Sequence, residues 1–257
     1  MVTFAAVAAA TLSLFSRYSA RRVPGERGAT TAVLLFAVGL YLISPETHIG
    51  EWLYPRTGLG YLDTFIGTLC WIGALVALLH HVLDRLVDRD ELVELFDALL
   101  RWPITLAVPL MLAALYVSRT IALAPVPDIG DAPADVWLVA YRVLYYGTCL
   151  YLAALLLRCL AIVRRQDGGR SCHVATLYMA AIALVPVGIA LRVLSYVEGF
   201  WPLHEVIDVC RACTVLLVAS GAALSWHRKV RTAVHTQCAQ AATLRTIVVA
   251  DERPEAA

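Results

Sequence analysis

Seven long apolar runs constrain this chain more than any other feature of its sequence. They lie near residues 1–19, 29–44, 60–83, 102–124, 136–157, 174–197 and 206–226. About 20 apolar residues in a helix cross a hydrocarbon layer of about 30 Å. Backbone polar groups in lipid must be satisfied within the segment, and the alternating strands of a membrane barrel are absent. The predicted fold class is therefore all-α, a polytopic seven-helix transmembrane bundle.

The distribution of basic residues predicts the orientation of this bundle. Sixteen of the 21 Lys and Arg residues fall in one set of alternate loops and in the tail. They are Arg17, Arg21, Arg22, Arg27, Arg85, Arg89, Arg101, Arg158, Arg164, Arg165, Arg170, Arg228, Lys229, Arg231, Arg245 and Arg253. Basic residues accumulate on the cytoplasmic side of membrane proteins. We therefore expect a multi-pass protein of the cell membrane with its N-terminus outside and its C-terminus in the cytoplasm.

The first span is the least secure, because its apolar core from Val2 to Phe15 would reach only about 21 Å as a helix. Extension to Ser19 largely closes the gap. The arginines follow this run and no positive charge precedes it, which favours a reverse anchor over a signal peptide. Residues 1–226 are predicted to form the transmembrane helical domain, and residues 227–257 a short, basic, partly disordered cytoplasmic tail.

A segment between the third and fourth runs, residues 84–101, has apolar residues at helical spacing and is predicted to be a cytoplasmic interfacial helix. Its polar face carries six acids and three arginines. Because acidic side chains are repelled by an anionic membrane surface, we expect this face to meet the basic residues 227–231 or a cytoplasmic protein partner. A simple solvated face is the alternative.

Four arginines lie inside apolar runs, each in a different one: Arg119, Arg142, Arg192 and Arg211. Their spacing from the predicted outer ends of the helices places all four about 9 to 11 Å deep. An arginine at the centre of a membrane helix costs at least about 2.5 to 3.5 kcal/mol, so such residues usually face the bundle interior or a wet cavity. We therefore expect the four side chains to converge.

Two acids are candidate counter-ions for this arginine layer. Asp208 precedes Arg211 by three residues on the same helical face, and Asp63 lies near the start of the third run. The remaining positive charge favours an anion, such as a carboxylate, a phosphate or a lipid headgroup. The predicted ligand-binding residues are Arg119, Arg142, Arg192, Asp208 and Arg211. Two alternatives are side chains that extend to the outer lipid phosphates and a structural layer of salt bridges.

No catalytic, metal-binding or cofactor-binding signature is present, so the sequence does not indicate an enzyme. Cys210 and Cys213 have CxxC spacing, but no second pair lies at a zinc-ligand distance, and all seven cysteines are expected to be free thiols. No basic patch typical of nucleic-acid binding is seen. Membrane lipids, an anionic small molecule or lipid headgroup, and a cytoplasmic protein are the expected partners.

Two segments carry a resemblance to a known family: LLFAVGLYLISP (Leu34 to Pro45) and PRTGLGYLDTFIGTL (Pro55 to Leu69). With the arginine-rich first loop, they resemble an actinobacterial family of seven-span proteins classed as transporters. Members carry a longer cytoplasmic C-terminal domain than the residues that follow Trp226 here. The resemblance implies a seven-span fold and a transport function.

Two functions remain open from the sequence. The first is a transporter or a small-ligand-binding protein whose outward-facing site uses the arginine layer. The second is a regulatory or accessory membrane protein that docks cytoplasmic partners. No internal repeat is detected, although inverted repeats are common in secondary transporters.

Overall fold

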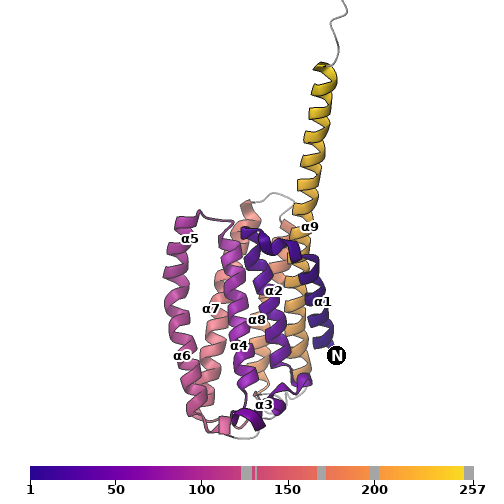
Figure 1. Ribbon diagram of the computed structural model, residues 1–257. Helices are drawn as coiled ribbons and strands as arrows, with labels where there is room; N and C mark the ends of the chain where they lie inside the picture. Colours follow the sequence, from indigo (N-terminus) through magenta and orange to yellow (C-terminus); the bar gives the residue numbers. More distant parts are fainter. Residues whose placement is uncertain (123–128, 131, 167–171, 197–202, 252–257) are drawn as a thin grey trace, which may run out of the picture.

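The computed structural model describes residues 1–122, 129–130, 132–166, 172–196 and 203–251, and the side chains of these residues except 21, 22, 24, 122 and 233–251 (Figure 1). The described part of the chain is helical and contains no strand. The α-helices are α1 (Val2–Ser16), α2 (Pro24–Ile43), α3 (Ile49–Thr57), α4 (Leu62–Leu83), α5 (Arg89–Phe96), α6 (Trp102–Val117), α7 (Val136–Gln166), α8 (Cys172–Leu194) and α9 (Leu203–Asp251). This confirms the all-α fold class.

Six helical segments of the described residues are long and apolar enough to cross a membrane. They are Gly25–Ile43, Leu62–Leu83, Arg89–Val117, Val136–Gln166, Cys172–Leu194 and Leu203–Thr232. Large apolar side chains also face outward; Leu106, Leu110 and Leu112 of α6, for example, are more than half exposed. Such an exposed apolar surface is expected against lipid. These features support a multi-pass integral membrane protein. The first expected span forms α1, which has 15 residues and is shorter than the other six.

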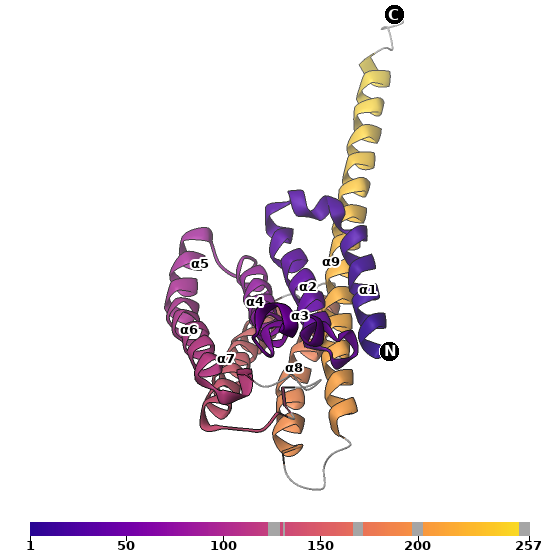
Figure 2. The ribbon, with the colours of Figure 1, turned by 60° about the horizontal axis from the view of Figure 1, so that its bottom comes forward.

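The bundle has two ends, which we name by their contents (Figures 1 and 2). The tail end carries the 3-10 turn Tyr18–Arg22, the turn at residues 84–88 and the point where α9 leaves the bundle. The α3 end carries α3 and the 3-10 turns Pro45–Thr47 and Arg119–Ala122. Between the two ends, α2 packs along α4 and α8 packs along α9.

Small residues allow α2 and α4 to approach closely. A Cβ at Gly39 would lie 3.0 Å from the carbonyl oxygen of Gly67, and a Cβ at Gly67 would lie 2.6 Å from the side chain of Ile43. Close backbone contact through glycine is typical of membrane helix pairs, whose association depends on van der Waals packing. Phe36 and Trp71 fill the same interface, with ring centroids 4.9 Å apart in an edge-to-face arrangement.

The predicted interfacial helix at 84–101 is not a separate element. Its second part is α5, which continues through a π-helical turn, Asp97–Arg101, into α6. Pro103 explains the irregular turn, because proline has no N–H to donate to the carbonyl four residues earlier. That carbonyl, of Leu99, accepts a hydrogen bond from the Tyr151 hydroxyl of α7 at 2.8 Å. The segment is therefore fixed to the bundle through α6.

The predicted boundary at residue 226 is also not a helix end. The helix α9 continues to Asp251 and extends beyond the bundle (Figures 1 and 2). In both views α5 and α9 lie on opposite sides of the bundle, so the acids of α5 do not face residues 227–231 within the chain. The start of the segment does approach α9, because Arg85 and Lys229 both pair with Glu26. Residues 252–257, where the tail was expected to be disordered, lie outside the described part.

Candidate functional site: an arginine-lined cavity

A cavity lies between α4, α7, α8 and α9, toward the α3 end. It encloses about 440 Å³, part of which is open to the surface. Most of its wall is apolar or aromatic, and its cationic side chains are Arg192 and Arg211. The remaining lining residues are Trp71, Tyr145, Tyr146, Cys149, Leu184, Val185, Gly188, Ile189, Ile207, Cys210 and Thr214. An apolar cavity with a few convergent polar groups is typical of a small-molecule site.

Arg192 and Arg211 reach this cavity from two different helices. Arg192, near the C-terminal end of α8, is 3% exposed. Arg211 lies in the third turn of α9, and its Nη1 lies 3.2 Å from Oδ1 of Asp208. The expected ion pair between Asp208 and Arg211 is therefore present. Both members are partly exposed, and Arg211 lines the cavity.

The Arg142 side chain forms hydrogen bonds with backbone carbonyl groups. Its Nη2 donates hydrogen bonds to the carbonyl oxygens of Ile129 at 2.6 Å, Gly130 at 3.2 Å and Ala132 at 3.4 Å. Its guanidinium also lies 4.9 Å from the ring centroid of Tyr196, a cation–π contact. Arg142 thus fastens the segment before α7 to the bundle.

Arg142 and Arg192 meet at Gly130. The Gly130 carbonyl accepts from Arg142, and a Cβ at this glycine would lie 2.5 Å from Cζ of Arg192. A side chain at this position would displace the guanidinium of Arg192. Three of the four predicted arginines are therefore neighbours: Arg142 and Arg192 at Gly130, and Arg192 and Arg211 around the cavity.

Arg119 does not belong to this group, so the prediction of four converging arginines is wrong for this residue. The expected span to residue 124 ends at Val117, and Arg119 is exposed in the following 3-10 turn. Asp135 explains the helix end, because it accepts hydrogen bonds from the Ser118 hydroxyl at 3.0 Å and from the Arg119 backbone N–H at 2.9 Å. It also accepts from the Leu138 N–H at 2.7 Å, which caps α7.

Asp63 is not a counter-ion of the layer. It is buried in the first turn of α4, where its carboxylate accepts a hydrogen bond from the backbone N–H of Gly50 in α3. A Cβ at Gly50 would lie 2.9 Å from this carboxylate. Asp63 therefore connects α3 to α4. Among the acids near the ends of these helices, Asp135 caps α7, Glu205 is exposed, and Glu198 lies outside the described residues.

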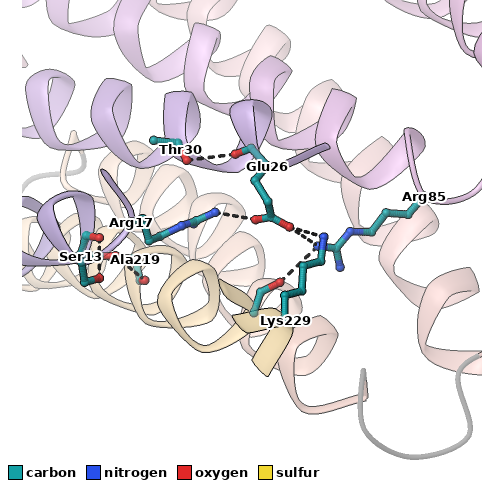
Figure 3. Close-up of polar contacts among 9 residues, drawn as sticks. Ser13, Arg17, Glu26, Thr30, Arg85, Ala219 and Lys229 are labelled. Atoms are coloured by element: carbon teal, nitrogen blue, oxygen red, sulfur yellow. Dashed lines mark hydrogen bonds and ion pairs between the residues drawn. The ribbon is translucent and has the colours of Figure 1, made fainter. Parts of the chain in front are cut away.

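A second polar cluster, at the tail end, was not predicted (Figure 3). Nη2 of Arg17 lies 2.7 Å from Oε2 of Glu26, and both side chains are fully buried. The other oxygen of Glu26, Oε1, pairs with Arg85 at 3.4 Å and with Lys229. One carboxylate thus joins residues from the ends of α1 and α4 and from α2 and α9. In the sequence, Arg17, Arg85 and Lys229 are indistinguishable from other loop charges. The available signal for the cluster was Glu26, an acid within the arginine-rich first loop.

The described residues contain no group of three or more His, Cys, Asp or Glu side chains placed to hold a metal ion. Six of the seven cysteines are free thiols, including Cys210 and Cys213. The chemistry that the arginine-lined cavity offers is charge complementarity to an anion, together with apolar and aromatic contact surface.

Comparisons with known proteins add no relative. No model of a known protein family, no characterised protein and no solved structure matches this chain. The architecture and the cavity therefore define the class of protein, a multi-pass helical membrane protein with an arginine-lined cavity.

Proposed function

We propose that this protein spans the membrane seven times, with its N-terminus outside, and binds a small amphipathic anion in the arginine-lined cavity. The observation that carries the proposal is that Arg192 and Arg211, from two helices, line one apolar cavity. The ligand would be a carboxylate or phosphate with an apolar part. Transport of this ligand is the favoured role, in keeping with the resemblance to a seven-span transporter family.

The contacts of α1 support the seventh span. The Met1 amino group pairs with Glu46, and the Ser44 hydroxyl donates to the Thr3 hydroxyl at 3.3 Å. Residues 44–46 directly follow α2, so the start of α1 lies level with the end of α2. At the other end, Arg17 pairs with Glu26 in the first turn of α2. The antiparallel α1 therefore covers nearly the same thickness as α2, which supports seven spans. Its basic turn, Tyr18–Arg22, would then lie on the cytoplasmic side with the other basic loops.

A binding measurement tests the anion site. The protein would be placed in phosphatidylcholine nanodiscs and its thermal unfolding followed while decanoate is added, with decanol as the uncharged control. We expect decanoate, but not decanol, to raise the unfolding temperature, because only the acid meets the guanidinium groups. Arg192→Gln and Arg211→Gln should each weaken the apparent affinity for decanoate by about tenfold, the loss of roughly one charge-assisted hydrogen bond.

Arg119→Gln is the matched control, since Arg119 is an exposed arginine on the same end and outside the cavity lining. Its affinity for decanoate should equal that of the unchanged protein. Equal affinities in all three variants would refute the site. Uptake of radiolabelled decanoate into proteoliposomes then separates transport from binding alone.

A docking role for the cytoplasmic side is the second candidate, and the extension of α9 beyond the bundle favours it (Figure 1). A photoreactive amino acid at position 240 should crosslink to another protein in native membranes. The same probe at position 106, whose leucine is exposed on the apolar surface of α6, should give no protein adduct. Identical patterns from the two positions would contradict a docking role for the extension.

A further inference from the structure

A second cavity lies at the tail end, between α4, α7 and α8, and none of its residues belongs to the site proposed above. The space between its lining atoms is about 310 Å³ and includes open solvent at its mouth. Its polar side chains are His81, Arg85 and Tyr178, and its apolar wall consists of Val82, Leu160, Val163, Val174 and Ala175.

Among the described residues, Tyr178 presents an unpartnered hydroxyl at this cavity. The side chain is 2% exposed, and within the described residues its hydroxyl makes no hydrogen bond. A buried hydroxyl without a partner costs about 1 to 3 kcal/mol, so native structures rarely leave one unsatisfied. The ring packs closely against α9 at Gly221, where an added Cβ would lie 2.9 Å from its Cε1. The hydroxyl is therefore available to donate to a ligand in the cavity.

The charge around this hydroxyl selects an anion. Tyr178 interacts electrostatically with Arg17, Arg85 and Glu26. Through Glu26, these residues form the cluster that also contains Lys229, which has three cations for one carboxylate. The contacts of Arg85 to Glu26 and to the Ser225 hydroxyl, at 3.4 Å and 3.2 Å, both use its Nη2. Its other guanidinium nitrogens can serve a ligand.

The position of the cavity favours a phosphate group among anions. Val174 and Ala175 line it from the first turn of α8, where backbone N–H groups have no partner within the helix and the helix dipole is positive. Helix N-termini with a nearby arginine are typical phosphate sites. The cavity also lies where α4 ends and α8 begins, a level expected for lipid headgroups at the tail end of the bundle.

We propose that the tail-end cavity binds a phosphate group through Arg85, the Tyr178 hydroxyl and the N-terminus of α8. The group belongs either to an anionic phospholipid or to a soluble phosphate ester. The apolar wall formed by Leu160, Val163 and Val174 lies beside the polar groups and would contact the glycerol and first acyl carbons of a lipid. This site is independent of the Arg192 and Arg211 cavity at the other end.

The test uses the full-length protein in maltoside detergent, which contains no phosphate. Phosphatidic acid, glycerol 3-phosphate and diacylglycerol would be added separately, with thermal unfolding and native mass spectrometry as readouts. We expect phosphatidic acid to bind and to raise the unfolding temperature, and diacylglycerol to have no effect. Stabilisation by glycerol 3-phosphate at similar concentration would identify a soluble ester as the source. No effect of either phosphate compound would overturn the proposal.

Tyr178→Phe is the decisive variant because it removes only the hydroxyl. It should weaken phosphate binding by about tenfold, the effect of one hydrogen bond to a charged group, while the unliganded protein unfolds at an unchanged or higher temperature. Tyr141→Phe is the control: its hydroxyl lies 3.0 Å from that of Thr68, so this change should lower stability without altering phosphate affinity. If Tyr178→Phe behaves like Tyr141→Phe, the proposal is wrong.

Two further variants locate the site. Arg85→Gln should weaken phosphate binding. Because this change also removes contacts to Glu26 and Ser225, the unfolding temperature of the variant with ligand is compared with that of the same variant without ligand. Arg192→Gln should leave phosphate binding at the tail end unchanged. A loss of phosphate binding in Arg192→Gln but not in Arg85→Gln would assign the ligand to the other cavity and overturn this inference.

Discussion

The tail end and the α3 end both carry several arginines, but the groups that contact these arginines differ between the two ends. At the tail end, the fully buried Arg17 and its neighbours Arg85 and Lys229 share the single carboxylate of Glu26. At the α3 end, Arg142 is satisfied mainly by backbone carbonyls, Arg211 pairs with Asp208, and Arg119 is exposed. The sequence positions of these arginines do not show which of them are buried, paired or exposed. The partner of each arginine, and not its depth, decides whether it holds the fold or faces a cavity.

The largest expected effect is at the tail end. Glu26→Gln would leave the buried Arg17 without a countercharge, which typically costs about 3 to 5 kcal/mol. The free energy of unfolding, measured by denaturant titration in detergent, should fall by about this amount. The double variant Arg17→Leu and Glu26→Leu should recover most of the loss, since it removes both charges together.

Asp97→Asn provides the exposed control for that measurement. Asp97 pairs with Arg101 at 3.0 Å, but both side chains are more than half exposed. Exposed pairs contribute about 0 to 1 kcal/mol. If Glu26→Gln and Asp97→Asn cost the same, the tail-end cluster does not hold the helices together and the contrast between the two ends is wrong.

An intermediate effect is expected at the α3 end. Arg142→Gln removes charged hydrogen bonds to the carbonyls of Ile129, Gly130 and Ala132, and should lower the free energy of unfolding by about 1.5 to 3 kcal/mol. Arg119→Gln should stay within about 0.5 kcal/mol, as surface changes usually do. Equal costs in the two variants would show that the backbone contacts of Arg142 are not stabilising.

The smallest effect concerns Asp135, which caps α7. Asp135→Ala should lower the free energy of unfolding by about 1 kcal/mol at neutral pH. Burial by itself would raise the pKa of Asp135, but hydrogen bonds from Leu138, Arg119 and Ser118 bring it below the usual value. A lowered folded-state pKa means that the stabilisation is complete above the unfolded-state pKa of about 3.9 and is lost as pH falls through the folded-state pKa.

Measurements at several pH values separate the contribution of the Asp135 charge from that of its capping hydrogen bond to α7. The difference in unfolding temperature between the unchanged protein and Asp135→Ala should therefore shrink between pH 5 and roughly pH 3. Asp135→Asn retains a capping side chain and should show less dependence on pH in this range. A difference that stays constant down to the acid limit would show that the carboxylate charge contributes nothing.

The sequence by itself determined the helical class and the approximate positions of the long apolar helices, because hydropathy and the need to satisfy backbone polar groups in lipid are local properties. It also predicted the pair of Asp208 and Arg211, since residues three apart meet on one helix face wherever that helix lies.

Only the tertiary structure decided which charges meet across helices. Glu26 and Lys229 are 203 positions apart, and nothing local relates them. The same holds for the meeting of Arg142 and Arg192 at Gly130 and for the unsatisfied hydroxyl of Tyr178, because both depend on which helix faces pack together. Arg119 lies outside the predicted layer because of another contact between distant residues: Asp135, 16 residues later, accepts a hydrogen bond from the Arg119 backbone N–H where the helix ends. Periodicity predicts where a side chain lies on its own helix, whereas its partner is set by packing between helices.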